Sequence, residues 1–147
     1  MDIGASTGGF TDCLLKHGIE KVFAVDVGYG QLDWKLQTDS RVVSLDRKNA
    51  RDLTPTDINE LVDLVVIDAS FISLRIIIPP VIKLLKPEGD LIALVKPQFE
   101  VGKEQVENKG IIKNPQKHLD VLIRLNSFMK KQGWPITNIV PSPITGQ

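Results

Sequence analysis

The sequence is poor in several residue types, and each shortage excludes a class of protein. Its 147 residues contain a single cysteine, Cys13, so an intrachain disulfide and a cysteine-rich metal site are both excluded. Cys13 stands beside two leucines in an expected helix, which favours a buried structural thiol over a nucleophile. The two histidines, His17 and His118, each lack a second ligand at metal spacing, so we expect no metal centre.

An excess of charge and a long apolar run are also missing. Eighteen basic residues balance eighteen acidic ones, whereas a domain that holds RNA by itself is usually basic. Neutrality therefore favours a small ligand, or an RNA held mainly by another domain. The isoleucine run at 76–78 stops at a proline pair, well short of a membrane span. The chain does not start with a basic and then apolar leader, so we expect a cytoplasmic protein.

The chain does contain apolar runs that alternate with helix-compatible segments. After a first strand ending near Asp2, strands are expected at 22–25, 42–45, 64–67, 91–95 and 134–140, and helices at 11–15, 31–37, 71–85 and 115–132. The prolines at 79–80 should kink or split the third helix. Residues 97–114 are expected to form a long mobile loop. This alternation predicts an α/β domain, a mostly parallel sheet with helices on both faces.

The opening segment has the form of a strand, a small-residue turn and a helix. Asp2 and Gly4 end the strand, and Gly8 and Gly9 precede the helix, so a ligand could lie against bare backbone and helix N–H groups. The spacing lacks the close glycine pair of the G-x-G-x-x-G fingerprint, which disfavours a nicotinamide dehydrogenase. Asp2 suits a cationic ligand such as the sulfonium S-adenosylmethionine. An ordinary glycine-rich turn would also explain these residues.

Polar side chains after the second and third expected strands could contact a nucleoside. Asp26 stands where a carboxylate accepts hydrogen bonds from both ribose hydroxyls, unless it is simply a solvated strand end. Asp46, or a residue of the triplet Asn49, Ala50 and Arg51, could present a polar edge to adenine. A solvated turn is the alternative there.

Asp68 and Lys96 follow two further strands and form the pair that most suggests catalysis. Because the carboxyl ends of parallel strands lie along one edge, both should face the same crevice as the opening turn. They are either a structural ion pair or a functional one. In the functional version, Asp68 orients Lys96, and Lys96 steers deprotonation of a substrate hydroxyl.

Four ordered blocks together resemble one family; they lie at 2–12, 26–31, 68–73 and 95–100, and read DIGASTGGFTD, DVGYGQ, DASFIS and VKPQFE. The chain is similar to the TlyA or haemolysin A family, part of the FtsJ-like group of S-adenosylmethionine-dependent RNA methyltransferases. The resemblance implies a Rossmann-like class I methyltransferase fold over residues 1–147. We expect the cofactor to contact ten residues: Asp2, Gly4, Ala5, Ser6, Gly8, Gly9, Phe10, Asp26, Asn49 and Asp68.

The resemblance also implies methyl transfer to ribose 2′-hydroxyls of ribosomal RNA, typically on cytidine. A Lys-Asp-Lys-Glu tetrad serves this reaction in the wider group; Asp68 matches its aspartate and Lys96 its second lysine. The first lysine, the glutamate and the family's S4-like RNA-binding domain have no counterpart in these residues. We therefore expect a domain truncated at both ends, in a protein that holds ribosomal RNA or ribosomal subunits mainly through the S4-like domain.

The haemolysin label suggests a different function, a non-enzymatic interaction or a cytolytic role. A pore former needs an apolar or amphipathic segment that inserts into a membrane, and the sequence shows none. A methyltransferase acting on a protein or a small molecule is a further alternative.

Overall fold

The computed structural model describes residues 1–102 and 112–144 and divides the chain into two compact units. The first unit is Met1–Glu100 and the second is Val101–Gln147. The first unit contains the sheet and the candidate site, and each unit is described below by itself. That residues 1–147 form one methyltransferase domain stays a prediction.

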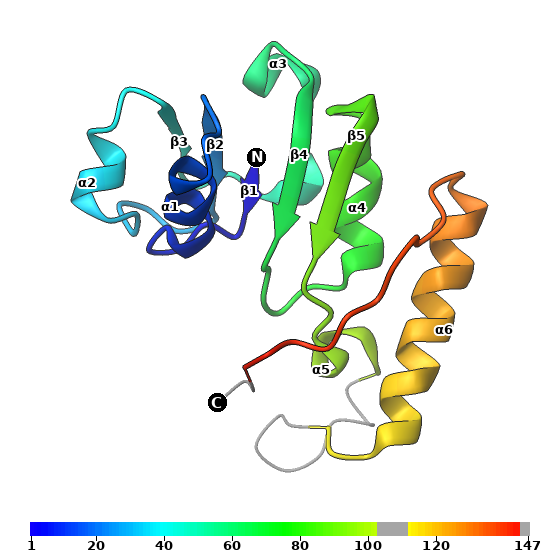
Figure 1. Cartoon of the computed structure of the whole chain (residues 1–147). Helices are drawn as coiled ribbons and strands as arrows, with labels where there is room; N and C mark the ends of the chain where they lie inside the picture. The colour runs from blue at the N-terminus through cyan, green and yellow to red at the C-terminus, as the bar shows by residue number, and fades with distance from the viewer. Residues whose placement is uncertain (103–111, 145–147) are drawn as a thin grey trace. The chain divides into compact units, whose positions relative to one another are not determined.

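A five-stranded parallel sheet forms the centre of the first unit (Figure 1). Its strands are β1 (Asp2–Ile3), β2 (Val22–Val25), β3 (Val42–Leu45), β4 (Val62–Ile67) and β5 (Leu85–Ala93). The spatial order is β3-β2-β1-β4-β5, so the chain moves outward from β1 in one direction and then returns to its other side. The order thus reverses between β1 and β4, where an open α/β sheet binds its ligand at the carboxyl ends of the strands. The expected Rossmann-like α/β fold is confirmed.

Burial of the strands explains why their sequences are continuous apolar runs. All four residues of β2 are buried, as are the last three of β4. Central strands of a parallel sheet are covered on both faces, so polar residues cannot alternate with apolar ones along them. The edge strand β3 is only half-buried. The register aligns Ile3 with Val25 on one side and with Ile67 on the other, which places the ends of β1, β2 and β4 level with one another.

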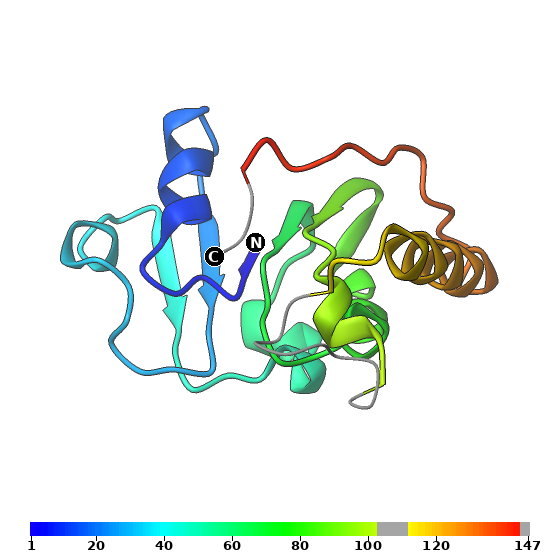
Figure 2. The same cartoon turned by 90° about the horizontal axis from the view of Figure 1, so that it is seen from below.

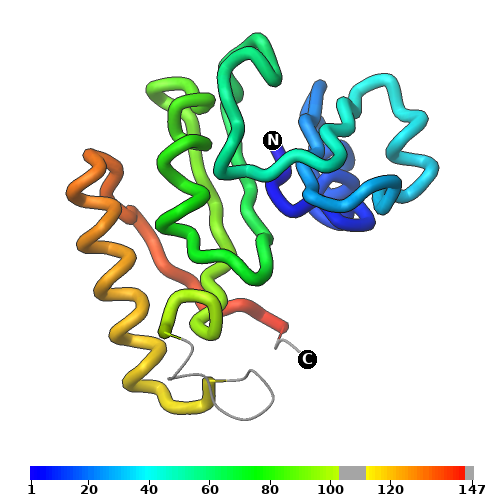
Figure 3. The backbone as a smooth tube through the Cα atoms, turned by 180° about the vertical axis from the view of Figure 1, so that it is seen from behind, coloured from blue at the N-terminus to red at the C-terminus, as the bar shows by residue number. Residues whose placement is uncertain are grey.

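The helices of the first unit cover both faces of the sheet. They are α1 (Gly9–Lys16), α2 (Trp34–Gln37), the 3-10 helix η1 (Ala50–Asp52), α3 (Pro55–Ile58), α4 (Leu74–Ile82) and α5 (Pro97–Glu100). Figures 1 and 2 show α1 on one face and α4 on the opposite face, and Figure 3 shows α4 in front of β4 and β5 from behind. The α1 face is apolar because Leu14 and Leu15 pack with Val22, Leu36 and Val66. Burial of such side chains is the main favourable term in folding.

Two expected helices are shorter than the sequence pattern suggests. The helix expected at 31–37 begins only at Trp34, since the Asp33 side chain caps it by accepting from the Lys35 N–H at 2.8 Å. The helix expected at 71–85 runs from Leu74 to Ile82 and retains Pro79 and Pro80 inside a single helix. Burial of its other face, at Ile77, Ile78 and Val81, stabilises the helix against the loss of hydrogen bonds at the prolines.

The second unit contains α6 (Pro115–Lys131), close to the expected 115–132. Asn114 caps α6, and Val121, Leu125 and Met129 form its buried stripe. The strand expected at 134–140 is wrong: described residues 132–144 contain no strand. Ile139 and Val140 of this segment are exposed, and the segment lacks the ladder of hydrogen bonds that defines a strand. Half of the loop expected at 97–114 lies outside the described residues, and its first part is the helix α5.

Candidate functional site

The opening turn between β1 and α1 has the backbone conformation that its glycines predict. Gly4, Ser6 and Gly8 have positive φ values of 81°, 49° and 100°. The N–H groups of Gly4 and Ala5 both donate to the carbonyl oxygen of Val25, at 2.9 and 3.1 Å. These bonds fasten the turn to the end of β2. Gly8 has the left-handed conformation that favours glycine, and a Cβ there would also push against the side-chain ends of Leu36 and Leu32.

The turn borders a cavity of about 410 Å³, which we call the glycine-turn cavity. Its lining residues are Gly4, Ala5, Ser6, Thr7, Gly9, Phe10, Cys13 and Asp68. This volume falls within the range of about 300–1,000 Å³ that is typical of small-molecule sites. The structure thus brings together six of the predicted cofactor residues and adds Thr7 and Cys13. Gly8, which was also predicted, packs behind the turn against Leu36.

Cys13 corrects an expectation from the sequence. The predicted buried thiol is exposed and lines the glycine-turn cavity, with Sγ 3.7 Å from Nδ1 of His17. Leu14 and Leu15 occupy the buried side of α1. Because α1 has 3.6 residues per turn, residues next to one another project in different directions. The burial of Leu14 and Leu15 therefore does not imply burial of Cys13.

Asp26, directly after β2, is joined to the turn. Its Oδ2 accepts from the Ser6 N–H at 2.8 Å, and its Oδ1 accepts from the Gly28 N–H at 2.7 Å. The half-buried carboxylate therefore holds the second strand end against the glycine turn. Each oxygen keeps a lone pair that could accept a ribose hydroxyl.

Asp2 lies beneath the turn and does not line the glycine-turn cavity. The residue is fully buried, and its Oδ2 accepts from Thr11 Oγ1 at 2.7 Å. Its Oδ1 has no hydrogen-bond partner among the described residues. Burial raises the pKa of Asp2, with the charge of Asp68 acting in the same direction and the hydrogen bond from Thr11 opposing it. Contact between Asp2 and a cationic ligand stays a prediction.

The residues after β3 serve local structure. Asn49 caps η1 by accepting from the Arg51 N–H at 3.2 Å, and it does not line the glycine-turn cavity. Asp46 accepts from the Gly30 N–H at 2.9 Å and from Ser44 Oγ at 2.7 Å, which together lower the pKa of its carboxyl. These bonds join the loop after β3 to the loop after β2. Contact of Asn49 with adenine stays a prediction.

The structure pairs Asp68 with Lys96 at the carboxyl edge of the sheet. Nζ of Lys96 lies 2.7 Å from Oδ1 of Asp68 and donates to Ser70 Oγ at 2.9 Å. The side chains are 22% and 35% exposed for Lys96 and Asp68, so water reaches both. Asp68 directly follows β4, whereas Lys96 stands three residues beyond β5. Sequence reasoning missed Ser70, although it lies inside one of the four blocks.

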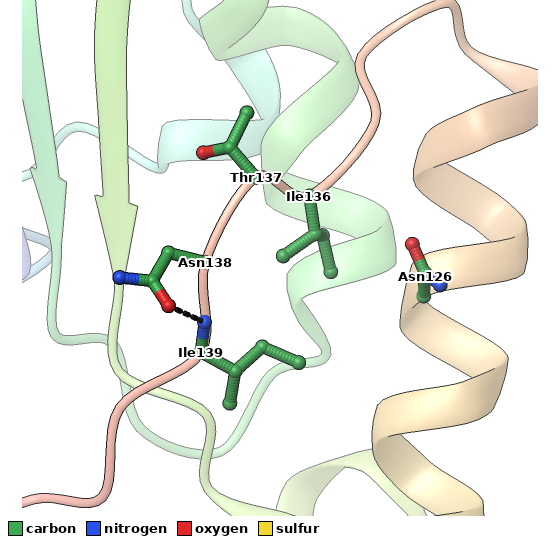
Figure 4. A pocket seen from close by; sticks show the side chains of 5 residues that line it. All are labelled: Asn126, Ile136, Thr137, Asn138 and Ile139. Atoms are coloured by element: carbon green, nitrogen blue, oxygen red, sulfur yellow. Dashed lines mark hydrogen bonds between the residues drawn. The ribbon is translucent and has the colours of Figure 1, made fainter.

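A second hollow, of about 270 Å³, lies within the second unit (Figure 4). It is lined by Asn126 of α6 and by residues 136–139, where Asn138 Oδ1 accepts from the Ile139 N–H at 2.9 Å. None of its lining residues is ionisable, so it offers no group for acid–base chemistry.

Over the described part of the chain, no group of three or more His, Cys, Asp or Glu residues could hold a metal ion. The same residues include no helix with the length and apolarity needed to cross a membrane.

The sheet order, the glycine-turn cavity at the switch point and the Asp68–Lys96 pair place a candidate cofactor site at the carboxyl edge of an α/β domain. Within that class, the chain belongs to the FtsJ-like methyltransferase family, whose model matches residues 1–147. Methyltransferases of this family generally use S-adenosylmethionine.

Three curated relatives are similar over 99% of the chain. YqxC of Bacillus subtilis (strain 168), by its name a proposed rRNA methyltransferase, is 52% identical. The 16S/23S rRNA (cytidine-2′-O)-methyltransferase TlyA of Mycobacterium tuberculosis (strain ATCC 25618 / H37Rv) is 47% identical, and Hemolysin A of Brachyspira hyodysenteriae is 44% identical. The chain spans 52%, 54% and 61% of their respective lengths.

Two solved structures are also similar to this chain, in fold as well as in sequence. A protein from Streptococcus thermophilus that carries a hemolysin name superimposes with a TM-score of 0.94 at 46% identity, covering 99% of this chain and 53% of the other. A second protein with a hemolysin name, from Lactococcus lactis, has a TM-score of 0.86 at 44% identity and covers 90% of this chain and 64% of the other.

Proposed function

We propose that this chain is the methyltransferase domain of an enzyme that methylates ribose 2′-hydroxyls of ribosomal RNA, with cytidine as the target nucleotide. The observation that carries this proposal is the Asp68–Lys96 pair, whose aspartate lines the glycine-turn cavity. A lysine held by a carboxylate beside a cofactor cavity is suited to act on a weakly acidic hydroxyl.

The residues of the glycine-turn cavity fit S-adenosylmethionine. The bare backbone at Gly4 and Gly9 allows close approach, and the start of α1 offers N–H groups to a carboxylate. Asp26 would accept hydrogen bonds from the ribose, and the buried carboxylate of Asp2 would favour the positive charge. Asn49 is proposed at the adenine side. When bound, this cofactor supplies an electrophilic methyl group.

Asp68 and Lys96 would act on the other reactant, the ribose hydroxyl. In methyl transfer an O–CH3 bond would form as the S–CH3 bond of the cofactor breaks, and the proton of the 2′-hydroxyl would pass to solvent water, which reaches this pair. The Lys96 ammonium would stabilise the negative charge that develops on the 2′-oxygen if that oxygen lies within hydrogen-bond reach. Asp68 Oδ1 and Ser70 Oγ restrict the ammonium to one position. Positioning of this kind accounts for much of the rate in a reaction between two bound reactants.

Ribosomal RNA is proposed as the substrate because TlyA relatives are named for rRNA methylation and the chain resembles that family. The formal net charge of zero means that the domain by itself attracts RNA only weakly. We therefore assign most RNA binding to an S4-like domain elsewhere in the full-length protein. Its substrate would place it in the cytoplasm.

Calorimetry and RNA methylation together test this function on the full-length protein. S-Adenosylmethionine should bind and NADH should not. Lys96→Ala should reduce methylation of ribosomal RNA by about 10²-fold or more. Lys86→Ala is the matched control, because Lys86 forms an ion pair of similar length with Asp63, at 2.6 Å, outside the site. Full methylation by the Lys96→Ala variant would remove Lys96 from the mechanism, and absence of S-adenosylmethionine binding would refute the enzymatic proposal.

The hemolysin names of several relatives support a second candidate, a lytic or interaction role. An erythrocyte-lysis assay separates the two functions, because lysis by contact with a membrane should not depend on Lys96. Equal lysis by wild type and Lys96→Ala, with no RNA methylation by either protein, would favour this second role.

A further inference from the structure

Glu100, the last residue of α5, is a buried carboxylate with no assigned role. Its side chain is only 3% exposed. A buried carboxylate is costly unless hydrogen bonds compensate for the lost water. The Leu74 N–H donates to Oε1 at 2.7 Å and Ser73 Oγ donates to Oε2 at 2.7 Å. Arg75 adds its charge, with Nε 3.6 Å from Oε2.

All of these partners come from the start of α4. The first N–H groups of a helix have no partner inside the helix, and Glu100 satisfies one of them from 26 positions away in the sequence. A carboxylate is also favoured at this end of the helix dipole. Arg75 Nη2 donates in addition to the Glu100 carbonyl at 3.3 Å. The end of α5 is therefore attached to the first turn of α4 through both side chain and backbone.

The same two loops carry the catalytic pair. The loop after β4 contains Asp68 and Ser70 and leads into α4, while the loop after β5 contains Lys96 and leads directly into α5 (Figure 1). The Phe99 N–H donates to the Lys96 carbonyl at 2.9 Å, so the backbone from Lys96 to Glu100 forms one short turn. Fixing Glu100 on α4 thus limits where Lys96 can lie.

We propose that Glu100 is a positioning residue for methyl transfer, acting by anchoring the turn that carries Lys96 onto the start of α4. Without this anchor, α5 can move away from α4, and the Lys96 ammonium leaves Asp68 and Ser70 for part of the time. The glycine-turn cavity contains no residue of α5, so its affinity for the cofactor is independent of the anchor. This inference rests on the proposed function of the Asp68–Lys96 pair.

Glu100→Ala in the full-length protein tests the anchor. We expect kcat for RNA methylation to fall at least tenfold, while the Kd of S-adenosylmethionine stays within about twofold of wild type. Glu100→Gln should restore kcat to within about threefold, because its amide oxygen still accepts from the Leu74 N–H. Glu88→Ala, at an exposed glutamate within β5, is the matched control and should behave as wild type. Hydrogen exchange at the Leu74 amide should quicken in Glu100→Ala and stay slow in Glu100→Gln.

A double-mutant cycle separates positioning from general stability. In a Lys96→Ala background, Glu100→Ala should reduce kcat no further, because Glu100 acts through Lys96. An equal additional loss in that background, or wild-type kcat in the single variant, would overturn the inference. If Glu100→Ala does not fold, Glu100→Asp replaces it, because the shorter side chain cannot reach both Ser73 and Leu74. Wild-type kcat in Glu100→Asp would likewise overturn the inference. Failure of the proposed function itself shows differently, as a wild-type protein that does not methylate RNA.

Discussion

A Cβ atom on Gly4 would lie 2.5 Å from the carbonyl oxygen of Asp68. The residue after β1 therefore packs against the backbone that follows β4, the neighbouring strand in the sheet. The candidate cofactor residues and the candidate catalytic residues meet at this point. This contact makes Gly4 necessary for two independent reasons, its φ of +81° and the missing side chain.

Gly4→Ala should destabilise the protein strongly. The left-handed backbone costs an alanine about 1–2 kcal/mol, and the overlap with Asp68 adds about 1–3 kcal/mol. Gly18→Ala is the control: Gly18 also has a positive φ, of +86°, and a Cβ there meets open space. The free energy of unfolding, measured by urea denaturation, should fall by about 1–2 kcal/mol in the control and by about 2–5 kcal/mol in Gly4→Ala. Equal losses of unfolding free energy in the two variants would show that the backbone at Asp68 moves aside without an energetic cost.

Asp68→Asn should reduce methylation by about 10²-fold, because an amide does not hold the Lys96 ammonium as a carboxylate does. The control is Asp63→Asn, since Asp63 pairs with Lys86 on the surface away from the site. Both variants should be assayed at saturating S-adenosylmethionine, so that the comparison concerns kcat. A full rate in Asp68→Asn would contradict a role for the charge of Asp68.

Asp26→Ala should weaken S-adenosylmethionine binding by at least about tenfold. The change removes the acceptor for two backbone N–H groups, those of Ser6 and Gly28, as well as the acceptor proposed for the ribose. Asp39→Ala is the control, because the Asp39 carboxylate accepts from Arg41, two positions away in the sequence. The measurement is the calorimetric Kd. An unchanged Kd in Asp26→Ala would mean that the ribose is held by other residues.

The stability of Asp2→Asn relative to wild type should increase as the pH rises. The pKa of Asp2 is raised in the folded state above its ordinary 3.8, mainly by burial. The stability that Asp2 contributes is therefore fully present below its unfolded pKa and is lost as the pH rises through its folded pKa. Asparagine keeps the hydrogen bond from Thr11 and does not ionise. We expect urea denaturation from about pH 4 to about pH 7 to show the free energy of unfolding of Asp2→Asn rising relative to that of wild type. A difference between the two free energies that stays constant with pH would contradict the raised pKa.

The sequence predicted best where burial repeats a simple pattern. Central strands covered on both faces must be continuously apolar, and the runs at 22–25 and 64–67 showed this directly. Strand ends were predictable as well, because Asp26 and Asp68 each follow directly after such a run. The run at 134–140 failed because an apolar segment becomes a strand only when another strand pairs with it.

Other features depended on contacts between distant residues. Cys13 was predicted to be buried, but which side of α1 faces the core depends on what packs against it. Asp2 was predicted at a ligand, and the structure places it beneath the turn with Thr11 as partner. Glu100 ends the block at 95–100, but no role could be assigned to it from the sequence, because its contacts are with Ser73 and Leu74.

The sequence by itself determined the succession of the five sheet strands along the chain, the glycine turn and the residue types at the strand ends. These are local properties, since backbone conformation and burial periodicity are set by residues close in the chain. Only the tertiary structure decided that Lys96 reaches Asp68, that Asp26 closes on Ser6 and that Glu100 caps α4. Those pairings join segments 20 or more positions apart, and they form only once the sheet brings the carboxyl ends of its strands together.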